Sequence, residues 1–244
     1  GAAAGPQNTP SRFADGGDLE NTGVASLLSY TDVDSVIAFV NSSDPLTAVG
    51  KGVMDAGGQE IAGTRVFVSF QLPPLFGYQP WDPVRGYVLY AGDANPSSPI
   101  FKHNQVFDSA DFPDLLQSLW SVTGNSGDPA AKGATGSQKI PGANQNPAVV
   151  EQSLTTQANA WFGVAGGRAV TLLWCYTNPV QAWVGLLQPD VQSLLQGPDF
   201  TTFPNFSADS SHLTVQQINL LASLTAWCVG NAGNGPAFVD LFGG

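Results

Sequence analysis

The sequence predicts a mainly β protein, an antiparallel, jelly-roll-like β-sandwich with one or two short helices and long loops. Two stretches carry this prediction. Residues 159–187 contain two β-branched and aromatic runs separated by Gly166-Gly167, a pair typical of hairpin turns that need positive φ, and residues 181–187 then fit a third antiparallel strand. Residues 64–72 alternate apolar and polar side chains, the pattern of a sheet with one wet face.

The length and composition indicate one large domain. The chain has 244 residues, of which 43% are hydrophobic, so it can build a substantial core. Residues 1–23 are rich in Gly, Ala, Pro and Asn and predict an extended N-terminal arm. We therefore divide the chain into that arm and a single β-sandwich domain over residues 24–244.

Further elements follow in chain order. The β-branched content of residues 36–40 favours a strand, and residues 86–90 resume the sheet after the loop that follows 64–72. Residues 111–123 repeat apolar side chains at helical spacing, with Asp111 as the expected cap and Gly124 as the stop.

The second half of the chain is less regular. The composition of residues 125–147 predicts a long exposed loop, which is either functional or mobile without a role of its own. Residues 189–197 fit a short helix ended by Gly197. Residues 213–229 fit a helix in the first half and a buried strand in the second, and residues 237–242 fit a last short strand.

The charge balance excludes some partners. Eight Lys and Arg against nineteen Asp and Glu give a net charge of −11, so we expect no direct binding of nucleic acid and no docking to an anionic membrane. No apolar run is long enough to span a bilayer. The cysteines, Cys175 and Cys228, each follow a Trp in an apolar run and suit either free buried thiols or one bridge between strands.

The loop over residues 75–83 offers a candidate ligand site. It carries Phe76, Tyr78 and Trp81 among Gly and Pro residues, and exposed aromatic rings could form a platform for a ligand. The alternative interpretation is that this loop caps an open end of the sandwich.

Catalytic constellations are weak. His103 and His212 lie in loops without a nucleophile motif, and Glu151 with Asp93 is the best carboxylate pair that a glycosidase could use. The acidic turns match no calcium loop, and no phosphate-binding motif is present. We therefore expect no enzyme, no metal and no cofactor.

The low charged fraction of 11%, the neutral loops and the Gly/Ala/Pro-rich arm favour a structural protein of a viral capsid. The expected role is an outer or projecting subunit in the virion that assembles with identical or related subunits and meets a host receptor. Phe13 in the arm and Ile140 in the long loop are the expected subunit contacts. The alternatives are a secreted, extracellular carbohydrate-binding β-sandwich and a glycoside hydrolase.

Overall fold

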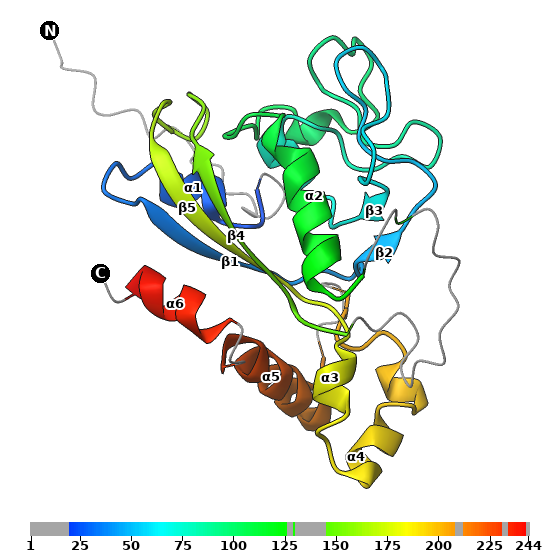
Figure 1. Ribbon diagram of the computed structural model, residues 1–244. Coiled ribbons are helices and arrows are strands. Elements are labelled where there is room, and N and C mark those ends of the chain that lie inside the picture. The colour runs from blue at the N-terminus through cyan, green and yellow to red at the C-terminus, as the bar shows by residue number, and fades with distance from the viewer. Residues whose placement is uncertain (1–19, 126–128, 130–144, 208–211, 231–233, 243–244) are drawn as a thin grey trace, which may run out of the picture.

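A computed structural model describes residues 20–125, 129, 145–207, 212–230 and 234–242 (Figure 1). The strands in these ranges are β1 (Ser35–Val40), β2 (Thr47–Ala48), β3 (Val66–Phe67), β4 (Ala148–Thr155) and β5 (Ala169–Tyr176). The α-helices are α1 (Val24–Leu28), α2 (Asp111–Val122), α3 (Gln181–Val184), α4 (Pro189–Leu194), α5 (Val215–Gly230) and α6 (Gly235–Phe242). Short 3-10 helices lie at Pro73–Phe76 (η2), Pro99–Phe101 (η3) and Pro198–Phe200 (η5).

The central sheet is mixed and has the order β1-β5-β4. β4 and β5 form an antiparallel pair in which Val150 lies opposite Trp174, and β1 runs parallel to β5 with Ala38 opposite Trp174. A parallel pair needs a long crossover, and the chain between β1 and β5 supplies it with β2, β3, α2 and their loops. β2 and β3 form a separate two-stranded antiparallel sheet.

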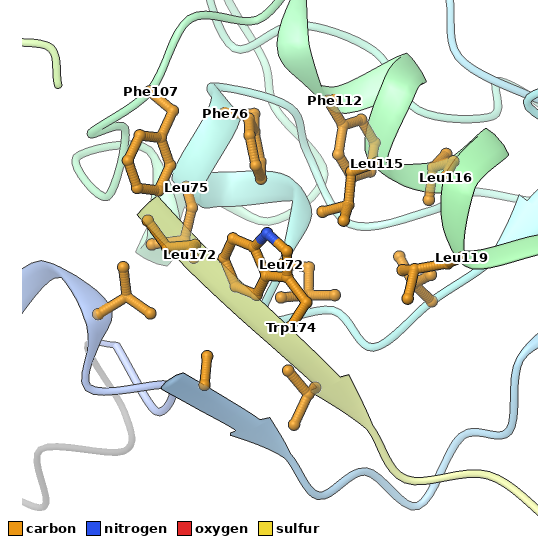
Figure 2. Close-up of a cluster of buried hydrophobic side chains, with 14 of the residues drawn as sticks. Leu72, Leu75, Phe76, Phe107, Phe112, Leu115, Leu116, Leu119, Leu172 and Trp174 are labelled. Carbon is orange, nitrogen blue, oxygen red and sulfur yellow. The ribbon is translucent and has the colours of Figure 1, made fainter. Parts of the chain in front are cut away.

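The main core lies between the inner face of the central sheet, α2 and η2 (Figure 2). The ring of Phe76 contacts those of Phe107, Phe112 and Trp174 at centroid distances of 5.4, 5.5 and 6.2 Å. Aromatic rings at such distances add to the free energy of apolar burial. The indole Nε1 of Trp174 donates to Gln152 on β4 at 3.1 Å, so the buried polar atom of this ring is satisfied.

The opposite, outer face of the central sheet is covered in part by α6. Side chains alternate between the faces of a strand, so Leu173 and Cys175 point away from the main core and pack with Val149 and Phe238 in a cluster of their own. Figure 1 shows α5 and α6 on the side of the sheet away from α2. The described residues therefore form three layers. A layer of helix and loop covers one face of the central sheet, and a helical layer covers part of the other face.

The expectation of sheets with short helices is confirmed, but the antiparallel sandwich is not seen in the ranges that the structure describes. The predicted three-stranded meander over residues 159–187 was wrong at both ends. Residues 160–163 form a turn, because the side chain of Asn159 accepts hydrogen bonds from the backbone N–H groups of Trp161 and Phe162. Residues 181–184 are helical because Val180, Trp183 and Val184 recur at helical spacing in a second apolar cluster.

Other boundaries also changed. The strand expected over 64–72 is reduced to β3, and residues 86–90 make only isolated bridges. The second half of residues 213–229 is helical with the first, and residues 237–242 are helical instead of extended. In both cases apolar residues three and four apart face the sheet or the second cluster, so packing favours the helix.

The predicted helix over 111–123 is confirmed as α2, and Gly124 follows it with a positive φ of 84°. The expected cap was wrong, because α2 begins after Ala110, and Asp111 is its first residue. The side chain of Asp108 accepts from the backbone N–H of Ala110 at 2.9 Å and supplies the local hydrogen bond at this turn. The predicted strand at 36–40 is confirmed as β1. The helix predicted over 189–197 is present as α4, but it ends at Leu194, before Gly197.

Candidate assembly surface

Helix α5 has no charged side chain in its 16 residues. It begins with a capping box, in which Gln217 N–H donates to Thr214 Oγ1 at 3.2 Å and Thr214 N–H donates to Gln217 Oε1 at 2.7 Å. Gln217 Nε2 also donates to the carbonyl of Asp199 at 2.7 Å, which ties the start of the helix to η5. The position of α5 is therefore fixed by polar contacts at its first turn.

One side of α5 packs against α3, η5 and the loop that follows it. Leu224 is buried there, and Leu220, Leu221, Trp227 and Cys228 are partly buried. The partners of these residues are Val180, Trp183, Val184, Leu195, Phe200 and Phe203. This second cluster is separate from the main core, so α5 is held by its own apolar contacts.

The opposite side of α5 is exposed and uncharged. We call it the α5 outer face, and it comprises Val215, Ile218, Asn219, Ala222, Ser223, Thr225 and Ala226. Val215 is 72% exposed and Ile218 is 51% exposed. Exposed apolar area such as that of Val215 and Ile218 costs about 25 cal/mol per Å². The small residues at 222, 223 and 226 also allow another helix to approach closely.

Beside α5, the two thiols line a cavity of about 30 Å³ with Phe39, Val149 and Phe238. This space holds about one water molecule, so it is too small for a ligand. Cys175 and Cys228 are not bonded to each other. Burial raises the pKa of Cys175 to about 12, with a smaller contribution from repulsion by Cys228, and burial raises the pKa of Cys228 to about 11.

The predicted aromatic platform lies mostly inside the protein. Phe76 and Tyr78 are buried in the main core, and the ring of Tyr78 lies 5.2 Å from that of Phe112. Trp81 is partly buried, donates from Nε1 to the carbonyl of Lys51 at 2.9 Å and meets Phe67 edge to face. Burial of the first two rings keeps them from stacking on a ligand at the surface.

The two predicted subunit contacts, Phe13 and Ile140, lie outside the described residues, as does most of the predicted loop at 125–147. Residues 20–23, at the end of the predicted arm, precede α1, and the backbone N–H groups of Thr22 and Ala25 donate to the carboxylate of Glu20. This segment therefore belongs to the folded part of the chain.

The candidate catalytic residues are dispersed. His103 stacks on Trp161, and His212 precedes α5. Asp93 is held by Gln79 and Arg85 at 2.8 and 3.0 Å, while Glu151 is exposed on β4. The side chain of Gln79 is the largest cause of the lowered pKa of Asp93. Within the ranges that the structure describes, no three His, Cys, Asp or Glu side chains could hold a metal together.

Two surface features were missed from the sequence. Trp161 was expected in a buried strand but is 74% exposed, and the α5 outer face was expected to belong partly to a strand. The charge-free run from Val215 to Gly230 was the available signal for α5. The Gly- and Ala-rich surroundings of Trp161, which suit a surface turn, were the signal for that residue.

The fold and this surface describe a mixed-sheet domain with an uncharged helical face. No described helix has both the length and the apolar character needed to cross a lipid bilayer. No protein-family model, curated protein or solved structure matches the chain.

Proposed function

We propose that this protein is a structural subunit of a viral capsid, in an outer or projecting position, and that it assembles with identical or related subunits. The observation that carries the proposal is the uncharged α5 outer face. Two copies of a chain with a net charge of −11 repel each other, and the repulsion is least where neither copy presents a charged side chain. The α5 outer face meets this condition and offers apolar area.

The geometry of this face suits a symmetric contact. Val215, Ile218 and Ala222 are spaced by three and four residues, so they form one stripe along α5. A two-fold contact brings the same stripe of two subunits together, and the small side chains of Ala222 and Ala226 permit close packing of the helices. The role is then mechanical, and it requires no catalytic residue, no cofactor and no bound nucleic acid.

The remaining expectations belong to the same proposal. The arm over residues 1–23, with Phe13, and the loop with Ile140 add contacts between subunits, and a host receptor binds the outer surface. The jelly-roll-like sandwich over residues 24–244 stays a prediction. The alternative is an extracellular carbohydrate-binding protein, favoured by the exposed ring of Trp161.

The test is the mass of the purified protein in solution, measured by light scattering over a concentration series, with electron microscopy of the same sample. We expect defined oligomers or particles. Ile218→Glu places a charge on the α5 outer face and should shift the protein to monomers. Removal of residues 1–19, which leaves the contacts of Glu20 at the start of α1 in place, should weaken assembly further. Val84→Glu is the matched control, because Val84 is 77% exposed in the loop between Trp81 and Gly86.

Two results would overturn the proposal. One is a monomer at every concentration with no particles in the microscope. The other is an oligomer that Ile218→Glu and Val84→Glu affect equally, because the contact would then lie elsewhere. Circular dichroism of both variants shows whether each is folded before its mass is interpreted.

A further inference from the structure

We propose that Trp161 and His103 form a binding platform for a neutral pyranose ring, such as a sugar of a cell-surface glycan. Trp161 lies in the loop between β4 and β5, and His103 lies in the loop between η3 and α2. Their centroids are 4.4 Å apart and their planes differ by 19°, so the imidazole covers one face of the indole. Because Trp161 is 74% exposed, its other face is open to solvent.

The platform is held in place by one buried residue. Asn159 Nδ2 donates to the carbonyls of His103 and Gln105 at 2.7 and 2.8 Å, which joins the loop before α2 to the loop that carries Trp161. Its Oδ1 accepts from the backbone N–H groups of Trp161 and Phe162 at 2.9 and 3.3 Å. The backbone groups of Asn159 and Val164 close the turn with two hydrogen bonds of 2.9 Å.

The loop that carries Trp161 is built of small and uncharged residues around the exposed ring. No residue from 157 to 167 carries a charge, and the exposed neighbours of Trp161 are Ala158, Ala160, Gly163, Ala165, Gly166 and Gly167. Gly166 has to be a glycine, since a Cβ there would lie 2.8 Å from the backbone nitrogen of Ala158. Small neighbours leave the open face of the indole accessible to a ring laid against it.

This chemistry selects among ligands. The face of an aromatic ring is partially negative and attracts the weakly positive C–H groups on one face of a pyranose. The imidazole of His103 adds nitrogen atoms that can hydrogen-bond to hydroxyls at the edge of the platform. Nucleic acid is disfavoured by the net charge of −11, although a base could stack on the indole.

A partner protein is the other class of macromolecule that an exposed Trp could bind. It is less favoured here, because an anchoring Trp is normally surrounded by further contact residues of the interface, whereas the exposed neighbours of Trp161 in this loop are Gly and Ala. Sugar binding at Trp161 does not depend on assembly through α5.

Preorganisation of the platform by Asn159 lowers the entropic cost of binding, which suits a weak ligand such as a single sugar.

The experiment is saturation-transfer difference NMR with the full chain and three probes: methyl β-glucopyranoside, methyl β-galactopyranoside and the methyl glycoside of N-acetylglucosamine. We expect enhancement of the ring C–H protons of at least one sugar, with a dissociation constant in the millimolar range. Trp161→Ala should weaken binding by about tenfold or more, and Trp161→Tyr should restore part of it. His103→Ala should weaken binding by several-fold, because the indole loses its stacking partner.

The matched control is Phe39→Ala, which removes another half-exposed aromatic ring from a different part of the surface and should leave sugar binding unchanged. The proposal is overturned if none of the three sugars shows enhancement, or if Trp161→Ala gives the same enhancement as the original protein. The proposal is also overturned if the original protein binds none of the sugars and Trp161→Ala loses its oligomers. Trp161 would then belong to a contact between proteins. Failure of assembly through α5 is measured separately by light scattering, so the two proposals can fail independently.

Discussion

The rings of Phe39 in β1 and Phe238 in α6 stack, with centroids 6.4 Å apart and planes 24° apart. Phe238 is buried, whereas Phe39 is 53% exposed. This contact joins the last described helix to the edge strand of the central sheet. It covers Val149 and Cys175 on the outer face of that sheet.

Phe238→Ala should lower the free energy of unfolding by about 3 kcal/mol, because the ring is lost from a buried cluster and a cavity remains. Urea unfolding monitored by circular dichroism measures the change. Val239→Ala alters the neighbouring exposed residue of α6 and should change stability by less than about 0.5 kcal/mol. Equal effects of the two substitutions would mean that α6 does not pack on the sheet.

Gly86→Ala should be strongly destabilising, whereas Gly92→Ala should cost about 1 kcal/mol. Both glycines have positive φ, of 73° and 86°. A Cβ at Gly86 would overlap the carbonyl oxygen of Gly52, but a Cβ at Gly92 meets no atom within 4 Å. We expect thermal unfolding to show a difference of at least about 2 kcal/mol between the variants. Similar midpoints would contradict the close approach of Gly86 to Gly52.

Glu60→Gln should reduce stability at pH 7 by about 1 kcal/mol. Arg65 makes a bidentate ion pair with Glu60 at 2.6 and 2.9 Å, and this hydrogen bonding is the largest cause of the lowered pKa of Glu60. A carboxylate with a lowered folded-state pKa stabilises the protein above its unfolded pKa of about 4.3, and that contribution is lost as pH falls through the folded pKa.

The difference between Glu60→Gln and the original protein should therefore disappear in strong acid. Urea unfolding at pH 7 and at progressively lower pH checks this. Glu151→Gln removes an exposed carboxylate on β4 and should change stability by less than about 0.5 kcal/mol at pH 7. A Glu60→Gln difference that persists in strong acid would show that the ionised carboxylate is not its source.

The two thiols should react with a disulfide reagent far more slowly in the folded protein than in urea. The thiolate is the reactive form, and burial raises the pKa of Cys175 to about 12 and that of Cys228 to about 11. Both thiols should become available on unfolding without reductant, because they are free. If no thiol reacts in urea until a reductant is added, the cysteines are bridged.

The same thiols predict a loss of stability in alkali. Unfolded cysteines release their protons near pH 8.5, before the folded ones, so stability should fall as pH rises from about 8.5 toward the folded values. The double substitution Cys175→Ala and Cys228→Ala should reduce this part of the alkaline loss. An unchanged pH dependence would show that the buried thiols do not contribute.

Asn159→Ala should destabilise the protein by about 2 kcal/mol and loosen the loop that carries Trp161. It removes the side chain that accepts from two backbone N–H groups and donates to two carbonyls. Backbone groups that stay buried without a hydrogen-bond partner lower the stability of the folded state. Urea unfolding gives the change in stability, and amide hydrogen exchange at residues 161 and 162 reports the local opening. Asn219→Ala on the α5 outer face is the control and should be nearly neutral.

Local patterns in the sequence determined the elements that need few distant partners. Helix α2 has its apolar residues at regular helical spacing and a glycine after its end, and β1 is a short run of mainly β-branched and aromatic residues. For such segments the local preference and the tertiary packing agree. The net charge of −11 and the absence of a membrane-length apolar run were likewise readable directly.

The tertiary structure alone decided which apolar residues face water. Trp161 and Trp183 lie in similar Ala-Trp sequences. The turn that the side chain of Asn159 closes leaves Trp161 exposed, whereas packing in the second apolar cluster buries Trp183 in α3. Apolar runs of this length fit a strand or a helix equally well, so the choice depends on contacts with distant residues. For the same reason the parallel pairing of β1 with β5 and the exposed side of α5 could not be derived from local sequence.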